Sequence, residues 1–223
     1  MAKASDNLYP YVHVVPAAAP ASPAAGSERL FLDSADGNKL KRKNSSGSVT
    51  TIESSGGTPG RVLLKETILA AAVATVSFTS TDIPTSGYRH LQLQVVARSS
   101  VAATQDNVFM ALNADTTAAN YLRSRLTGVN TTVSGISQAD RGLGAISAAS
   151  ASANSAGLID VTFLNYRDTT FDKVAHGFNY NRGATTIQQL AWEWFNTAAI
   201  TSLDLTCGGN FAIGSKFQLY GLV

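Results

Sequence analysis

The chain has 223 residues, which fits one ordinary domain with an appended segment. Charged residues make up 14% of it, and 17 basic against 15 acidic residues give a formal net charge of +2. This composition excludes a membrane-inserted chain, a wholly disordered chain and a strongly basic nucleic-acid binder. The longest apolar run, Ile68 to Val76, is shorter than the roughly 20 residues of a membrane-spanning helix. The first six residues have no apolar core of the kind that follows the charges of a secretion signal.

Residues 1–27 are rich in proline and alanine, and five of the six prolines lie within the first 60 residues. Because proline fixes φ and removes an amide donor, we expect an extended arm close to polyproline II. Such an arm has no core of its own. We therefore expect it to be ordered by lying on a sister subunit or on another protein.

Residues 28–60 predict a small β-meander followed by a Gly/Ser linker. Strands are expected at 29–32, 39–43 and 49–53, with an Asp-Gly turn at 34–38 and a second turn at 44–47. Three strands of about five residues have too little apolar face to be stable alone, so this unit should need neighbours. Residues 54–60 have the composition of a linker.

The second of these strands is strongly basic, with Lys39, Lys41, Arg42 and Lys43. One interpretation is a solvated edge strand whose lysines discourage unwanted sheet pairing. The other is a basic strip that docks on an acidic partner surface. The strip is too short to predict nucleic-acid binding.

From residue 61 to 223 apolar and polar residues alternate with a period of two. The expected strands are 63–68, 76–79, 90–95, 108–112, 121–126, 159–164, 173–179, 190–194, 200–205 and 217–220. Eight or more short strands in about 160 residues predict an antiparallel two-sheet sandwich of the jelly-roll kind. The Ala/Ser-rich stretch 145–157 is expected to be a loop.

Three side chains in this domain have two interpretations each. Trp192 and Trp194 share a strand face with Leu190, which favours core residues over a sugar-stacking platform. Cys207 shares a face with Leu203 and Leu205, which favours a buried thiol over a nucleophile.

The sequence contains no strong catalytic or metal-binding pattern. His13, His90 and His176 are not at metal-ligand spacing, and Asp115 is expected to cap local amides in a turn. Residues 209–216 superficially resemble a phosphate loop, but the Ser and Lys are in the wrong order and a strand is expected to follow. We therefore predict a non-enzymatic protein with no catalytic residues, cofactor or metal, although an active site assembled across strands stays open.

Several stretches, taken in order, resemble bacteriophage virion proteins. The arm and meander, PAAGSERLFLDSADGNKLKRKNSSGSVTTIE, resemble the N-terminal segments of tail-fibre and minor structural proteins. The main domain resembles a phage jelly-roll module in IPTSGYRHLQLQVVARSS, ALNADTTAANY, DVTFLNYRDTTFDK and GSKFQLYGLV.

This resemblance implies a structural virion component, assembled in the host cytoplasm and anchored to capsid or tail by its arm. The jelly roll would be exposed on the particle as capsid decoration, head fibre or tail fibre. It also implies a homotrimer whose partners are other virion proteins. The alternative is a tail receptor-binding protein for host attachment that contacts surface glycans. A third class, a glycan-degrading enzyme, needs a carboxylate pair that the sequence does not show.

Overall fold

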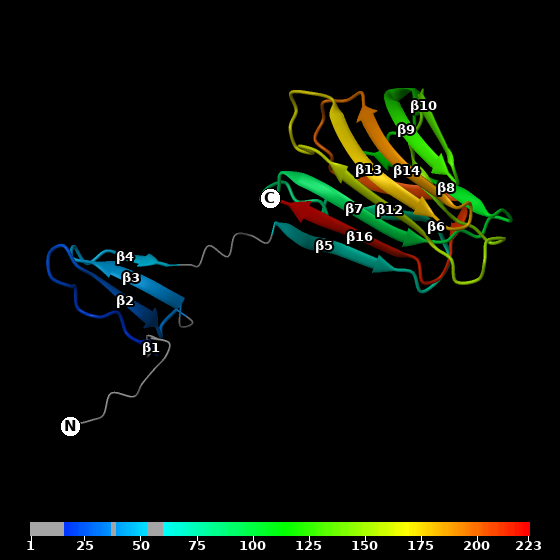
Figure 1. The fold of residues 1–223 in the computed structure, drawn as a ribbon. Coiled ribbons are helices and arrows are strands. Elements are labelled where there is room, and N and C mark those ends of the chain that lie inside the picture. The colour runs from blue at the N-terminus through cyan, green and yellow to red at the C-terminus, as the bar shows by residue number, and fades with distance from the viewer. Residues whose placement is uncertain (1–15, 37–38, 53–59) are drawn as a thin grey trace. The chain divides into compact units, whose positions relative to one another are not determined.

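The structure is a computed structural model that describes residues 16–36, 39–52 and 60–223 (Figure 1). It divides the chain into two units, Met1–Thr58 and Pro59–Val223. Parts of four predicted segments lie outside the described residues. These are residues 1–15 of the arm, 37–38 of the turn, 53 of the third meander strand and 54–59 of the linker. The described residues form strands and one short 3-10 helix, η1 (Ala118–Asn120), so the predicted all-β class is confirmed.

The first unit contains a four-stranded sheet. Its strands are β1 (Pro16–Ala17), β2 (Glu28–Asp33), β3 (Lys39–Asn44) and β4 (Val49–Thr51), in that order across the sheet. β2, β3 and β4 pair antiparallel as a meander, and β1 adds to β2 in parallel. Between β3 and β4 the Asn44 side chain accepts a hydrogen bond from the Ser48 amide over 2.9 Å. Gly47 takes the left-handed φ of 88° in this turn.

The described part of the predicted arm lies against this same sheet. Lys43 donates from Nζ to the Pro20 carbonyl over 2.8 Å. Pro23 and Phe31 are the buried side chains among the residues up to 52 whose burial is described. Residues 16–27 therefore contact their own chain, and the expected contact with a sister subunit or another protein stays a prediction. Two buried side chains still make a very small core for an isolated sheet of short strands.

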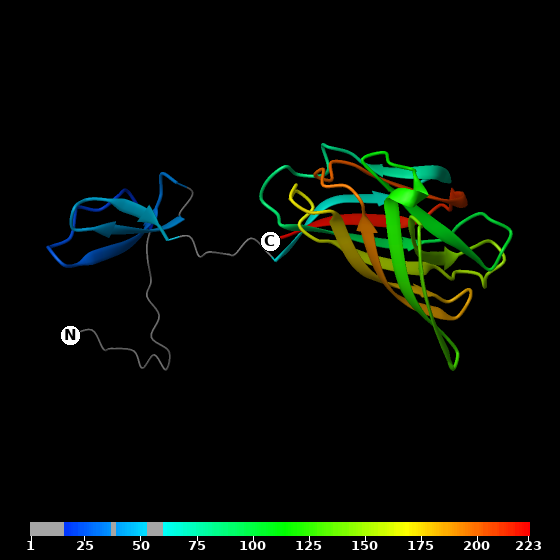
Figure 2. The ribbon, with the colours of Figure 1, turned by 90° about the horizontal axis from the view of Figure 1, so that it is seen from above.

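The second unit has two antiparallel sheets, seen as layers in Figure 2. Its strands are β5 (Arg61–Ile68), β6 (Val73–Phe78), β7 (His90–Ala97), β8 (Gln105–Leu112), β9 (Tyr121–Val129), β10 (Thr132–Gln138), β11 (Gly142–Ser147), β12 (Gly157–Phe163), β13 (Lys173–Asn181), β14 (Thr186–Trp194), β15 (Leu203–Phe211) and β16 (Lys216–Leu222). The larger sheet has the order β10-β9-β14-β13-β12-β7-β16-β5, and the smaller has the order β11-β8-β15-β6.

Eight of these strands pair in a nested order. β5 pairs with β16, β6 with β15, β7 with β12, and β8 with β11. The other four strands form two hairpins, β9–β10 and β13–β14. The hairpins follow β8 and β12 in the chain, and both extend the larger sheet beyond β12.

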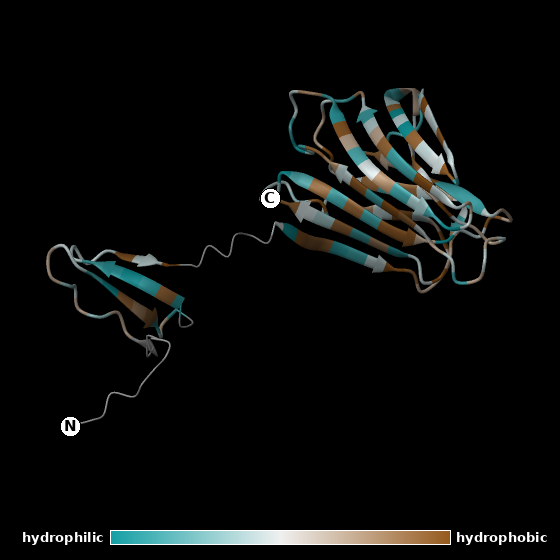
Figure 3. Ribbon diagram, in the orientation of Figure 1, coloured by the Kyte–Doolittle hydropathy of each residue, from teal (hydrophilic) through white to brown (hydrophobic). Residues whose placement is uncertain are grey.

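The core of the second unit combines side chains from both sheets. In β7 the residues Leu91, Leu93 and Val95 are buried, and β8 and β15 of the smaller sheet contribute Met110 and Leu205 to the same cluster. Figure 3 shows hydrophobic and hydrophilic residues alternating along the strands of the larger sheet. The period of two that predicted these strands therefore comes from one covered and one solvated face.

Trp192 and Trp194 are core residues, as predicted. Both lie on the buried face of β14, and Tyr121 stacks on Trp194 with ring centroids 6.2 Å apart. The Trp192 indole N–H donates to the Gly142 carbonyl over 2.7 Å. A sugar-stacking platform at these two rings is excluded, because both are covered.

Two strands, β10 and β11, have no counterpart in the sequence-based prediction. Every residue of β10 is exposed, and every residue of β11 is buried. Neither strand has one polar and one apolar face, so neither shows the alternation that identifies a strand. The loop predicted at 145–157 is therefore wrong for residues 145–147, which complete β11, and for residue 157, which begins β12.

The remainder of that Ala/Ser-rich stretch is a loop held by one side chain. The guanidinium of Arg98 donates over 2.9–3.0 Å to the carbonyl oxygens of Ala149, Ala151, Ser152 and Ser155. The planar guanidinium fork presents five N–H donors in fixed directions. Arg98 therefore holds the loop in one conformation, which the short alanine and serine side chains do not do.

Candidate functional site

The basic strand β3 contains the residues predicted to dock a partner. It lies between β2 and β4 and is hydrogen-bonded on both sides. The interpretation as a solvated edge strand is therefore wrong, because its lysines protect no free edge. A run of basic residues does not reveal how many neighbours its strand has.

Lys41 is largely enclosed by two carboxylates. Its Nζ lies 2.8 Å from Asp33 Oδ2 and 2.8 Å from Asp36 Oδ2, and the side chain is 13% exposed. The hydrogen bonds from Lys41 hold the pKa of both carboxyls below the usual value, and the two carboxylates raise the pKa of Lys41. Lys41 therefore stabilises the end of β2 and is not free to bind.

The other three basic side chains also have partners within the first unit. Arg42 lies 3.4 Å from Glu28, Lys39 lies 3.2 Å from Asp36, and Lys43 binds the arm as described above. The side chains of Lys39 and Arg42 are about half exposed. The docking role stays a prediction, and these are the two side chains that reach a partner if it holds.

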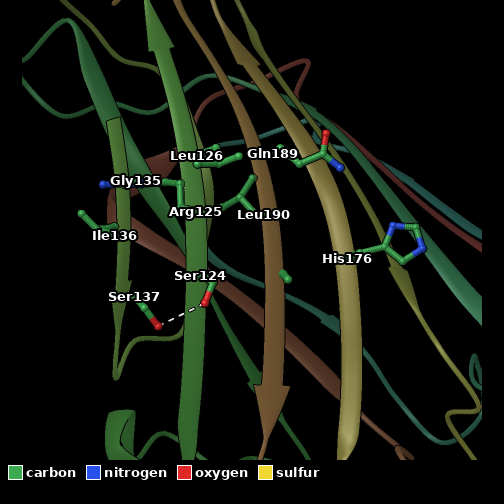
Figure 4. Close-up of a pocket in the computed structure, with 10 residues that line it drawn as sticks. Ser124, Arg125, Leu126, Gly135, Ile136, Ser137, His176, Gln189 and Leu190 are labelled. Atoms are coloured by element: carbon green, nitrogen blue, oxygen red, sulfur yellow. Dashed lines mark hydrogen bonds between the residues drawn. The ribbon is translucent and has the colours of Figure 1, made fainter. Parts of the chain in front are cut away.

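A second candidate site is a groove on the outer face of the larger sheet, the face turned away from the smaller sheet (Figure 4). The groove has a volume of about 470 Å³ and lies over β13, β14, β9 and β10. Four of its lining residues, His176, Ala191, Ser124 and Ser137, are cross-strand neighbours in one row. Because Ala191 and the two serines are small, the sheet surface is hollowed along this row.

Polar and apolar groups meet in this groove. The hydroxyls of Ser124 and Ser137 are hydrogen-bonded over 3.1 Å, and Leu126 and Gln189 line the groove from the next row. Hydroxyl, amide and imidazole groups next to apolar carbon suit a small uncharged polar ligand. Sequence reasoning missed this groove because it did not predict β10 and treated His176 as an ordinary strand residue.

Asp115 and Tyr121 form a structural network rather than a reactive one. The Tyr121 hydroxyl accepts from the Leu112 amide and donates to the Asp115 carbonyl, each over 3.0 Å. Burial raises the pKa of Tyr121 to about 12. The Asp115 carboxylate accepts from the Thr117 amide over 2.9 Å, which confirms the predicted turn cap.

Cys207 is only half-buried, although it packs on the core from the face of Leu203 and Leu205. The predicted full burial is wrong because the alternation of β15 breaks at this residue, within the register irregularity between Thr206 and Phe211. Its Sγ donates to the Gly209 carbonyl over 3.2 Å. Burial raises the pKa of the thiol to about 11, which keeps it protonated and unreactive at neutral pH.

The segment that resembles a phosphate loop and two of the histidines have ordinary places in the chain. Residues 209–216 end β15 and lead into β16, so a strand follows as predicted. His13 lies outside the described residues, whereas the Nδ1 atom of His90 accepts from the Asn165 amide over 2.9 Å. Within residues 16–36, 39–52 and 60–223 no three His, Cys, Asp or Glu side chains are grouped to hold a metal ion. The same described ranges include no helix long and apolar enough to cross a membrane.

Comparison of the chain with protein-family models, with curated proteins and with solved structures returned no match. The resemblance to bacteriophage proteins therefore stays a prediction from sequence.

Proposed function

We propose that this chain is a non-enzymatic structural component of a bacteriophage virion. Its first unit anchors to the capsid or tail, and its second unit is exposed on the particle as decoration or fibre. Its partners in this role are other virion proteins and further copies of itself, arranged as a homotrimer.

The observation that carries the proposal is the nested pairing of eight strands in the second unit. A jelly roll is an antiparallel arrangement in which the first strand pairs with the last, the second with the last but one, and so on, folded into two sheets. The strand orders β5-β16-β7-β12 and β6-β15-β8-β11 support a jelly roll, which the two hairpins would extend. Jelly rolls recur in viral capsid proteins and in lectins, which supports a particle-surface role.

The make-up of the first unit supports its role as the anchor. Its sheet has four short strands and, in its described part, two buried side chains. A unit with so little core gains most by burying further surface against a partner. Lys39 and Arg42 give that partner two cationic side chains to bind.

Density-gradient purification of particles from the host tests this proposal. We expect the full chain to band with the particles and to resist a high-salt wash, with its amount measured by quantitative mass spectrometry. A chain that stays at the top of the gradient while capsid protein bands below contradicts the proposal.

The groove at His176 supports the alternative of a receptor-binding protein that contacts host glycans. A glycan array with the full-length protein tests this alternative. Binding that is lost in His176→Ala and Gln189→Ala but kept in Phe171→Ala, an exposed change outside the groove, favours host attachment. Absence of binding to any glycan leaves the structural role as the better explanation.

A further inference from the structure

Exposed apolar side chains form one cross-strand row on the outer face of the larger sheet. The row begins at one edge of the sheet and ends at the other. In order it contains Val133, Gly128, Ile187, Tyr180, Leu158, Val96, Lys216 and Ile68, one residue from each of the eight strands.

The apolar members of this row are open to solvent. Val133 is 74% exposed, Ile68 58%, Ile187 51%, Val96 46% and Tyr180 43%. Solvent-facing positions of an antiparallel sheet are ordinarily polar. The row is apolar from Ile187 to Val96 and is interrupted at Gly128 and Lys216, and exposed apolar surface of this kind marks an interaction site.

The length of the row indicates what kind of partner fits it. Eight strands about 4.8 Å apart give a row roughly 34 Å long, which no small ligand covers. Sheets pack face to face at about 10 Å through rows of apolar side chains. The partner therefore offers a matching extended face, and a second copy of this chain carries one of equal length.

The charged groups in and beside the row have hydrogen-bond or ion-pair partners within the chain. Lys216 Nζ lies 2.8 Å from Glu66 Oε2. The side-chain amides of Gln92 and Gln94 each donate over 2.7 Å to a different carboxylate oxygen of Asp160. Such a face does not select a strongly acidic or basic partner, and it places few unpaired like charges against each other when two copies meet.

The strand at one end of the row is also unprotected. β10 (Thr132–Gln138) has neither a charged residue nor proline, and it pairs with β9 without a register shift. Exposed sheet edges are usually blunted by charges, proline or bulges. The opposite edge, β5, carries Arg61, Lys65 and Glu66 and has a register shift in its pairing with β16. The bare β10 edge is consistent with a region that is covered in an assembly.

We propose that a second copy of this chain packs on this outer face, through the apolar row from Val133 to Ile68. The second unit then supplies an interface between copies, whereas the sequence alone suggested the arm and meander. This inference does not rest on the virion role, since self-association is measured on the purified protein.

Light scattering on the full-length protein at micromolar concentration tests the proposal. We expect a mass that is a multiple of the 23.3 kDa chain. The double variant Val96→Arg with Ile187→Arg should fall to the mass of one chain. The control Phe171→Arg, which changes an equally exposed apolar residue in the β12–β13 connection, should keep the wild-type mass.

Thermal melting of each variant shows whether it is folded. If the arginine pair unfolds the protein, the milder pair Val96→Ser with Ile187→Ser replaces it. A wild-type protein with the mass of one chain overturns the proposal, and so does a folded double variant that keeps the oligomer's mass. The latter result moves the interface to the first unit or to another face.

Discussion

The indole N–H of Trp194 donates to Oδ2 of Asp115 over 2.8 Å, although 79 positions separate the two residues in the chain. This contact ties the turn after β8 to the buried face of β14. The same carboxylate accepts from the side chain of Asn120 and from the amide of Thr117, so one turn residue satisfies three donors.

The stability of the fold should therefore depend on the charge of Asp115. Burial acts to raise the pKa of Asp115, but hydrogen bonds from Trp194, Asn120 and Thr117 outweigh it and hold the pKa below 3.8. A carboxyl with a lowered folded pKa contributes stability above its unfolded pKa, about 4, and loses it as pH falls through the folded value. We expect the free energy of unfolding to fall less steeply below about pH 4 in Asp115→Asn than in the wild type, because the amide binds no proton. Urea titrations at several pH values in that range measure this free energy. If it falls equally steeply with pH in both proteins, Asp115 is not a cause of the pH dependence.

Truncation of either core tryptophan should destabilise the protein strongly. Trp192→Ala or Trp194→Ala is expected to lower the free energy of unfolding by about 3–5 kcal/mol, because each removes a buried ring. Phe171→Ala is the matched control, since that ring is exposed, and it should change stability by less than about 0.5 kcal/mol. Equal stabilities for the three variants would show that the two tryptophans are not core residues.

Arg98 should control the order of the loop between β11 and β12. Arg98→Ala removes the donor for four carbonyls and is expected to cost about 1.5–3 kcal/mol. Arg98→Lys keeps the charge but not the planar fork, so it should recover only part of that loss. Hydrogen exchange of the amides at 149–155 measures the loop directly, and unchanged protection in Arg98→Ala would refute this role.

Sequence predicted the fold wherever one strand face is covered and the other solvated. Leu91, Leu93 and Val95 alternate with polar residues and were assigned correctly to a half-buried strand. β10 and β11 were not predicted, because β10 is exposed throughout and β11 is buried throughout. The surroundings of Lys41 were not predicted either. Its pairing with Asp33 and the position of β3 inside the sheet are set by tertiary contacts. The groove at His176 depends on two hairpins from separate parts of the chain, β9–β10 and β13–β14, which no local pattern brings together.

Removing the first unit should separate folding from assembly. The core of the second unit is built from residues 69–219, so a chain lacking residues 1–56 should stay soluble and melt as a folded protein. We expect it to fail to join particles, because the proposed anchor is gone. Incorporation of the truncated chain at normal occupancy would mean that the second unit carries the attachment.

The position and copy number of the chain on purified particles test the structural role most directly. A cryo-electron microscopy reconstruction of wild-type particles, compared with particles that lack the chain, locates the difference density and counts the copies. We predict density at the outer surface of the capsid or tail that fits the two-sheet unit, in groups of three. Identical reconstructions, with the chain absent from the wild-type particles by mass spectrometry, would contradict the claim that it is a structural component of the virion.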